Sequence, residues 1–173
     1  MKLLTLAASS SRQSINKHLA MYAASLVTGA EVDILDINDF EMPLYSIDRE
    51  TETGIPVLAK DFLNRIAQAD AIIISFAEHN GSYTAAYKNL FDWASRIDPK
   101  VYQNKPMLLL ATSPGPSGAS TVLTAAVNSA PYFAGDVKAS LSIPSFYDNF
   151  DLETQQLTNT EFHQKLQTLV TTL

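Results

Sequence analysis

Three segments of the sequence are rich in hydroxyl, amide and glycine residues that could bind an anion or a planar ring. They are Ser9–Asn16 (SSSRQSIN), Glu78–Tyr83 (EHNGSY) and Ser113–Gly118 (SPGPSG). Each segment follows an apolar run and leads into a helical pattern. In an open parallel sheet, the loops at the carboxyl ends of neighbouring strands meet in one crevice, where such folds bind ligands. We therefore expect the three segments to form one binding site.

The first segment has the composition of a phosphate-binding loop. Its candidate ligands are the side chains of Ser9, Ser11, Arg12, Ser14 and Asn16. A helix N-terminus adds unpaired N–H groups and partial positive charge. Lys17 and His18 follow in the first turn, where the helix dipole disfavours cations, and a bound phosphate would offset that conflict. The alternative is an ordinary loop in which Ser14 caps the helix.

The second segment is suited to a flat ring. Asn80-Gly81 is a strong turn signal, and glycine lets the backbone approach a ligand closely. Backbone N–H groups in this segment could bond ring atoms that gain charge during hydride transfer. The candidate residues are Glu78, His79, Asn80, Gly81 and Ser82. Glu78 and His79 have no acid–base partner visible in the sequence.

The third segment is expected to border the other side of the ring. Pro114 stiffens the chain, Gly115 and Gly118 allow a close approach, and Ser113 adds a hydroxyl. A phosphate loop beside a ring site describes a mononucleotide, and flavin mononucleotide (FMN) is the leading candidate. The sequence has no Gly-x-Gly-x-x-Gly, so a dinucleotide pyrophosphate is not expected on the first turn. No catalytic base is assigned, because flavin chemistry does not require one.

Apolar runs alternate with helical patterns, which predicts a parallel sheet covered by helices on both faces. The expected strands are Lys2–Ala7, Glu31–Asp36, Ala71–Phe76, Pro106–Thr112 and Val137–Ile143. Helical spacing of apolar residues runs from Ile15 to Leu26, Leu58 to Ile66, Tyr83 to Ala94, about Ser117 to Val127, and Phe162 to Val170.

The strand patterns also predict the order of the sheet. The first, third and fourth expected strands are nearly continuous apolar runs, which is typical of strands buried on both faces. The second and fifth alternate with polar residues and are expected at the edges. The predicted fold is therefore a flavodoxin-like three-layer α/β sandwich with strand order 2-1-3-4-5. A Rossmann half would place the third strand at an edge.

Length and composition fit one flavodoxin-like domain spanning residues 1–173. The net charge is −6, from 12 basic and 18 acidic residues, which argues against a nucleic-acid surface. Without cysteine there is no disulfide framework, thiolate nucleophile or cysteine metal site. The first apolar stretch is too short for a signal peptide, and no run is long enough to span a membrane. We expect a cytoplasmic protein.

At these residues the sequence resembles the NAD(P)H-dependent FMN reductase family, which includes chromate, quinone and azo-dye reductases. Ser9, Ser14 and Asn16 are in register with the family's Gly-Ser-x-Arg-x-x-Ser-x-Asn phosphate motif. The most specific likeness is Asn80–Tyr83 followed by Lys88–Arg96 (KNLFDWASR), which is similar to the family's Asn-Gly-Ser-Tyr…Lys-Asn-Ala-Ile-Asp-Trp segment. Further likenesses, to the loops after the second and fourth strands, are Pro43–Tyr45 with Asp48, and Ser113–Gly115.

The sequence also departs from the family pattern. Ala8 replaces the first glycine of the phosphate motif, and Ser11 stands where arginine is usual, with Arg12 one place later. The residues that replace a proline, a tyrosine and a second proline around the ring segment are Ala77, His79 and Thr84. The resemblance therefore implies FMN binding, but no substrate preference is carried over.

The resemblance implies an oxidoreductase that takes hydride from NADPH or NADH and reduces a small acceptor. Quinones, azo compounds, free flavin and metal oxyanions are the acceptor classes, and a homodimer or homotetramer is expected. The alternative is a flavodoxin-like electron carrier that docks on protein partners. A receiver-type signalling domain would need acidic residues clustered after the first strand, and a serine hydrolase would need Gly-x-Ser-x-Gly. The sequence has neither.

Overall fold

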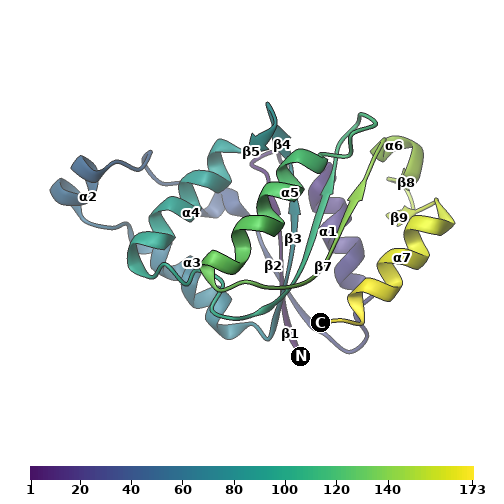
Figure 1. The fold of residues 1–173 in the computed structure, drawn as a ribbon, viewed down its shortest axis with the longest axis horizontal. Coiled ribbons are helices and arrows are strands. Elements are labelled where there is room, and N and C mark those ends of the chain that lie inside the picture. Colours follow the sequence, from purple (N-terminus) through teal and green to yellow (C-terminus); the bar gives the residue numbers. More distant parts are fainter.

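The computed structural model describes all of residues 1–173 as a five-stranded parallel sheet with helices on both faces (Figure 1). The strands of the sheet are β1 (Lys2–Ala8), β2 (Glu31–Leu35), β3 (Ala71–Phe76), β6 (Pro106–Thr112) and β7 (Asp136–Ile143). Their order is β2-β1-β3-β6-β7, and every neighbouring pair is parallel. The flavodoxin-like fold and strand order are therefore confirmed.

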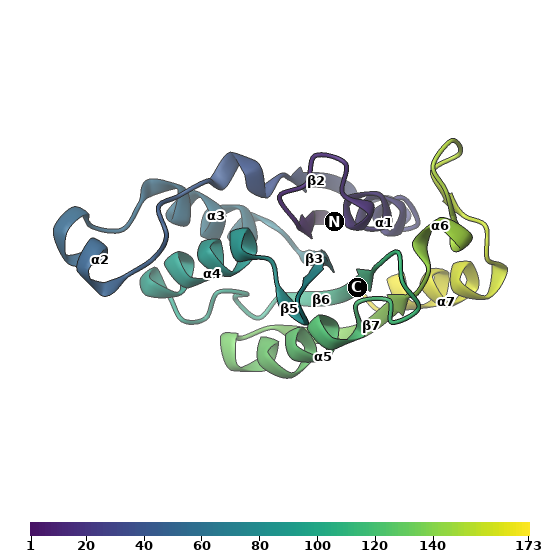
Figure 2. The ribbon, with the colours of Figure 1, turned by 90° about the horizontal axis from the view of Figure 1, so that it is seen from above.

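Two apolar cores form because side chains along a strand alternate between the faces of the sheet. Leu4 and Leu6 of β1 join the core on one face, and Leu3 joins the core on the other. The first core lies under α3 (Val57–Gln68), α4 (Ala85–Ile97) and α5 (Ser120–Ser129). The second lies under α1 (Ile15–Ser25) and α7 (Thr160–Val170). Figure 2 shows one layer of helices on each side of the sheet.

The burial of the strands agrees with their positions in the sheet. All six residues of the central strand β3 are buried, whereas four of the five residues of β2 are exposed. β7 alternates between exposed and partly buried residues over most of its length. Polar alternation in a strand thus identified both edges correctly.

Several short elements carry no periodic pattern that could predict them. They are η1 (Ile37–Phe40), α2 (Ile47–Thr53), β4 (Glu78–His79), β5 (Ser82–Tyr83), η2 (Ala130–Phe133), α6 (Phe146–Asn149), β8 (Phe150–Asp151) and β9 (Gln156–Leu157). Tyr83 lies in β5, so the helix expected from Tyr83 begins two residues later. It begins there because the Thr84 side chain caps it, accepting the N–H of Tyr87.

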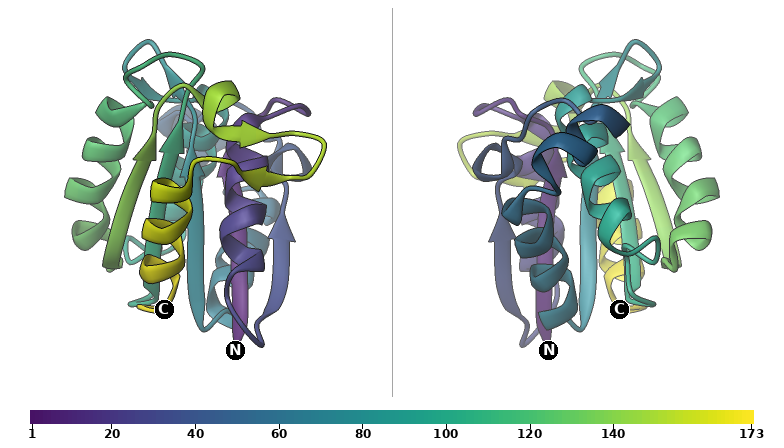
Figure 3. Two further views of the ribbon diagram at one scale, coloured as in Figure 1. Left: turned by 90° about the vertical axis from the view of Figure 1, so that its right-hand side faces the viewer. Right: turned by 90° about the vertical axis from the view of Figure 1, so that its left-hand side faces the viewer.

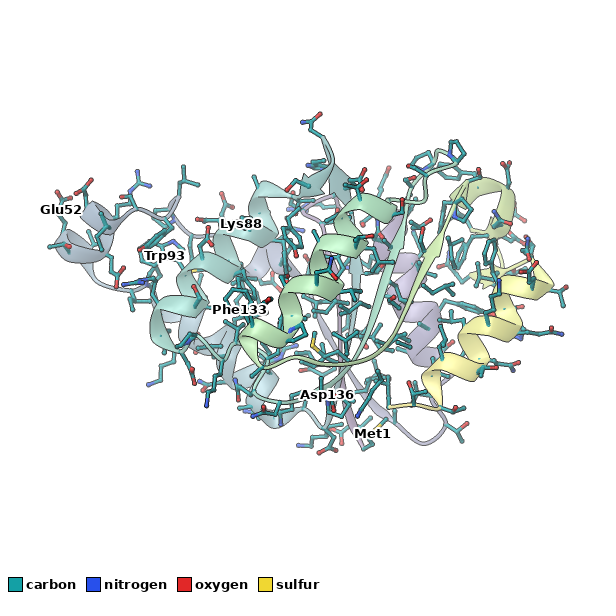
Figure 4. All side chains as sticks on the ribbon, viewed as in Figure 1. Met1, Glu52, Lys88, Trp93, Phe133 and Asp136 are labelled. Atoms are coloured by element: carbon teal, nitrogen blue, oxygen red, sulfur yellow. The ribbon has the colours of Figure 1, made fainter.

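Residues 41–56 form an arm that carries α2 away from the body of the molecule (Figure 1). Helix α4 holds the base of the arm. The Asn89 side chain accepts the Tyr45 N–H at 2.8 Å and donates to the Met42 carbonyl at 3.0 Å. Trp93 Nε1 donates to the Pro43 carbonyl at 2.7 Å. In Figure 4, Glu52 lies near the tip of the arm and Trp93 near its base.

This clamp explains the most specific part of the family likeness. Asn89, Trp93 and Arg96 are spaced along one face of α4, and Arg96 Nε bonds Glu50 in the arm at 2.8 Å. Asn89 and Trp93 of the Lys-Asn-x-x-Asp-Trp pattern therefore fix the arm to the body, while its Lys88 and Asp92 pair with each other.

None of the helices is both long and apolar enough to cross a membrane.

Candidate cofactor site

The loops after β1, β3 and β6 line one open pocket of about 230 Å³ at the carboxyl edge of the sheet. The lining residues are Ser9, Ser11, Gln13 and Ser14 from the first loop with Ile15 and Asn16 at the start of α1, Ala77, Glu78 and His79 from the second loop, Thr112 at the end of β6 with Ser113 and Pro114 from the third loop, and Tyr147. The structure thus brings the three segments together. Arg12, Asn80, Gly81, Ser82, Gly115 and Gly118 do not line this pocket.

Three serine hydroxyls in the first loop each accept a backbone N–H. Ser9 Oγ accepts from Ser11, Ser11 Oγ from Gln13, and Ser14 Oγ from Lys17, each at 3.3 Å. A hydroxyl has one proton to donate and two acceptor lone pairs. Each of these hydroxyls therefore keeps its own proton for a ligand in the pocket.

The start of α1 adds two backbone donors. The N–H groups of Ile15 and Asn16 have no acceptor within the chain, as is usual for the first residues of a helix. Ser14 is the N-cap, so the capping role and a ligand role coexist in one side chain. Neutral hydroxyls and helix N–H groups facing one pocket are a donor set that suits a phosphate.

Lys17 and His18 lie in the first turn of α1, as expected, and each side chain has a partner within the chain. Lys17 Nζ pairs with Asp36 at 3.1 Å. The Asn38 backbone N–H, together with Lys17, holds the pKa of Asp36 below its usual value. His18 Nδ1 lies 2.6 Å from the Gln155 side-chain oxygen. Lys17 thus has a charged partner within the chain, whereas the partner of His18 is a neutral amide.

Arg12 is exposed, and its side chain forms no ion pair or hydrogen bond with the rest of the chain. It stands in the turn before α1 and outside the pocket lining. The structure therefore gives no contact that would fix its guanidinium over the first loop.

The Asn16 side chain is used inside the protein. Its Oδ1 accepts from Ser75 Oγ at 2.7 Å and from the Thr112 N–H at 3.1 Å. Its Nδ2 donates to the Thr112 carbonyl at 3.1 Å, and the residue is only 2% exposed. The amide therefore joins α1 to β3 and β6, and its direct contact with a phosphate stays a prediction.

The second loop is a two-residue β-hairpin. β4 and β5 pair antiparallel, and Asn80 and Gly81 both have positive φ, 52° and 75°. This is the backbone of a tight primed turn, for which Asn-Gly is favoured. The expected turn is confirmed, and its exposed tip stands above the end of β3 (Figure 3).

The hairpin is fixed to the body on both strands. Glu78 Oε2 accepts the Val122 N–H at 2.9 Å in the first turn of α5, whose N-cap residue, Ala119, provides no side-chain acceptor. Tyr83 Oη lies 3.1 Å from Ser129 Oγ at the other end of α5. A carboxylate is well placed there, because a helix N-terminus favours negative charge. Glu78 thus has a structural partner.

Gly118 in the third loop serves packing. It is buried with φ of 59°, and a Cβ there would lie 2.3 Å from Ser142 Oγ and 2.9 Å from the Pro144 nitrogen. Packing against the end of β7 therefore requires glycine at this position, which lies outside the pocket lining, and a close approach of Gly118 to a ring stays a prediction. Gly115 has open space, and its carbonyl accepts the Ser145 N–H at 2.9 Å.

Tyr147 is a lining residue that the sequence did not indicate. It lies in the short helix α6 and is 61% exposed, with its ring edge-on to Phe146 at 5.5 Å between centroids. One aromatic residue after an edge strand carries no pattern that could identify it. The structure has no cluster of His, Asp or Glu side chains that could hold a metal ion.

Comparison with known proteins places the chain among flavin reductases. A family model described as NADPH-dependent FMN reductase matches residues 1–148. The chain is 37% identical over 120 residues to 2-hydroxy-1,4-benzoquinone reductase of a Burkholderia species, covering 68% of this chain and 63% of the relative. It is 35% identical over 95 residues to quinone reductase of Escherichia coli K12, covering 55% and 48%. The matches thus span about half to two thirds of these relatives.

Solved structures support the fold. FerB, a flavoenzyme NAD(P)H:(acceptor) oxidoreductase from Paracoccus denitrificans, aligns with a TM-score of 0.77 at 24% identity, over 98% of this chain and 93% of that one. Azoreductase AzrA aligns with a TM-score of 0.63 at 14% identity, over 99% and 94%. With the family match covering most of the sequence, this chain belongs to the NADPH-dependent FMN reductase family.

Proposed function

We propose that the protein binds FMN noncovalently and transfers hydride from NADPH or NADH to a small acceptor. The observation that carries the proposal is the donor set of the first loop. Three serine protons and two helix N–H groups are free at one pocket, beside the hairpin and the third loop. Family membership and the names of the relatives support the same activity.

In this proposal, Ser9, Ser11 and Ser14 donate to the phosphate together with the N–H groups of Ile15 and Asn16. The Glu78–Ser82 hairpin orients the ring through its backbone, and Ser113, Pro114 and Gly115 border its other side. Tyr147 closes the pocket from α6. Accepting and releasing hydride is the chemistry that FMN supplies when bound, so the protein's part is binding, orientation and exclusion of water.

Quinones are the acceptor class that the names of the relatives favour, with azo compounds, free flavin and metal oxyanions as further candidates. The competing function is an electron carrier for protein partners. The relatives named above are reductases of small molecules, which favours the enzyme.

We also propose that the protein assembles as a homodimer or homotetramer through the arm. Leu44 and Ile47 in the arm are 71% and 59% exposed, and Val57, the first residue of α3 after the arm, is 69% exposed. Apolar side chains gathered on a projecting element are typical of an interaction surface. The proposed location is the cytoplasm, with neither nucleic acid nor membrane as a partner.

Steady-state NADPH oxidation by the FMN-loaded protein, with and without a quinone, tests the activity. We expect oxidation that depends on both FMN and the quinone and that follows ping-pong kinetics. A protein that binds FMN but oxidises neither NADPH nor NADH with any of the four acceptor classes would instead favour the carrier.

A further inference from the structure

Asn16 has an arrangement of hydrogen bonds that a phosphate ligand would not need. Its amide exchanges two hydrogen bonds with the backbone of one residue, Thr112, and accepts a third from the Ser75 hydroxyl. Thr112 and Ser75 are 1% and 0% exposed. Both partner residues are therefore buried, and they belong to the neighbouring strands β6 and β3.

Asn16 bonds the Thr112 backbone because the pairing of β3 with β6 stops before Thr112. The ladder between β3 and β6 ends with the pair Phe76 and Ala111, one residue before Thr112. The N–H and carbonyl of Thr112 would have no strand partner on that side, and unpaired buried polar groups are costly. A primary amide carries a donor and an acceptor side by side, so Asn16 replaces the missing peptide of a neighbouring strand.

The hydrogen bonds of Asn16 also affect the pocket, because they join two elements that line it. It is the second residue of α1, adjoining Ile15 with its free N–H, and Thr112 immediately precedes Ser113 of the third loop. One buried amide thus ties the start of α1 to the end of β6. The two loops that would hold opposite ends of a mononucleotide are held at a fixed distance by this contact.

We infer that the Asn16 side chain is a positioning residue that sets the geometry between the phosphate loop and the third loop. It acts through Thr112 and Ser75, while its backbone N–H remains free for the ligand. The inference rests on the proposed FMN site and changes the role of one of its residues. Replacing a direct phosphate ligand should lower the affinity for FMN and not the affinity for riboflavin, which has no phosphate. Replacing a positioning residue should lower both affinities.

Ser75→Ala is the discriminating variant, because Ser75 is fully buried and outside the pocket lining. It removes one of the three bonds of Asn16, and the Ser75 hydroxyl forms no other hydrogen bond. Asn16→Ala removes all three. The matched comparison is Ser14→Ala, which removes a proposed phosphate donor and leaves the Asn16 contacts intact.

The affinities of the apoproteins for FMN and riboflavin should be measured by calorimetry, well below the melting temperature of each variant. We expect Asn16→Ala to weaken FMN by about tenfold or more and riboflavin by at least about threefold, with Ser75→Ala changing both in the same direction by less. Ser14→Ala should weaken FMN alone. The Thr112 amide of the ligand-free protein should exchange with solvent at least about tenfold faster in Asn16→Ala.

Two results would overturn the inference. If Asn16→Ala weakens FMN and leaves both riboflavin and Thr112 exchange unchanged, the amide is a direct phosphate ligand. If it lowers the melting temperature and leaves both affinities unchanged, the amide only stabilises the fold. If Asn16→Ala does not fold, the same measurements on Ser75→Ala replace it, and the same two results would overturn the inference. Failure of the wild type to bind either flavin would refute the proposed function, while amide exchange would still test the contact itself.

Discussion

Ser14 combines two hydrogen-bonding roles that mutation can separate. Its oxygen caps α1 through Lys17, and its proton is free at the pocket. A hydrogen bond to a charged group contributes about 1.5–3 kcal/mol, so Ser14→Ala should weaken FMN by about tenfold or more and riboflavin by little. The variant should also lose about 1 kcal/mol of stability through the missing cap. Calorimetry and thermal melts measure the two effects.

Ser46→Ala is the matched control, because Ser46 caps α2 in the same way by accepting the Arg49 N–H. It should destabilise its helix and leave FMN affinity unchanged. Equal losses for FMN and riboflavin in Ser14→Ala would mean that Ser14 acts on the site only through the helix.

Residue types alone predicted which loops line the pocket, but not the contacts of every residue in them. The serines of the first loop could be identified because hydroxyls at a helix start suit an anion wherever the rest of the chain lies. The structural roles of Asn16 and Gly118 depend on residues that are distant in the sequence and close in the fold. Asn16 bonds a residue 96 positions away, and Gly118 is fixed by the space beside Ser142. No local pattern contains that information.

The β4–β5 hairpin can be tested at its turn. Gly81 has φ of 75°, and no other atom lies within 4 Å of the position that a Cβ would take. Gly81→Val should therefore strain the backbone of the turn without a steric clash with other residues. A side chain in left-handed backbone costs about 1–3 kcal/mol. If the hairpin backbone borders the ring, we expect a strong loss of FMN affinity or of turnover per bound FMN as well.

Gly29 supplies the control for that strain. It has φ of 73°, equally open space, and a position between α1 and β2, away from the pocket. Gly29→Val should show a similar shift in melting temperature with normal FMN affinity and turnover. If Gly81→Val also retains both, the hairpin does not form the ring site.

Glu78 allows a test of whether the hairpin is positioned or catalytic. Its carboxylate accepts the Val122 N–H, and glutamine retains an oxygen that can do the same. Glu78→Gln should therefore keep FMN affinity and turnover within about threefold of the wild type, since the bond loses only its charge-assisted part. Glu78→Ala should weaken FMN and riboflavin together. An equally large loss of turnover in Glu78→Gln would point to acid–base chemistry instead.

The arrangement of the whole sheet was predictable because it depends on which strands avoid water. The polar alternation of β2 and the apolar run of β3 are local properties that report burial on one face or two. The arm was not predictable in this way. Its path is held by Asn89 and Trp93, which lie more than one element away in the sequence.

Assembly through the arm makes a prediction at the scale of the whole molecule. Replacing Ile47, which is 59% exposed, by Asp places a charge on the proposed interface, so the mass in solution should fall towards that of the monomer. Light scattering coupled to size exclusion measures the mass. Tyr132→Asp, at an 85% exposed residue of η2, should leave it unchanged. A wild type that is already monomeric would contradict the proposed assembly.

The central claim is that this chain carries FMN and passes hydride through it. Anaerobic titration of the FMN-reconstituted protein with NADPH, followed by addition of a quinone, tests that claim most directly. We predict one bound FMN per chain, bleaching of its absorbance by about one equivalent of NADPH, and full recovery of the absorbance when the quinone is added. Failure to retain FMN, or a bound flavin that neither NADPH nor NADH bleaches, would contradict the account.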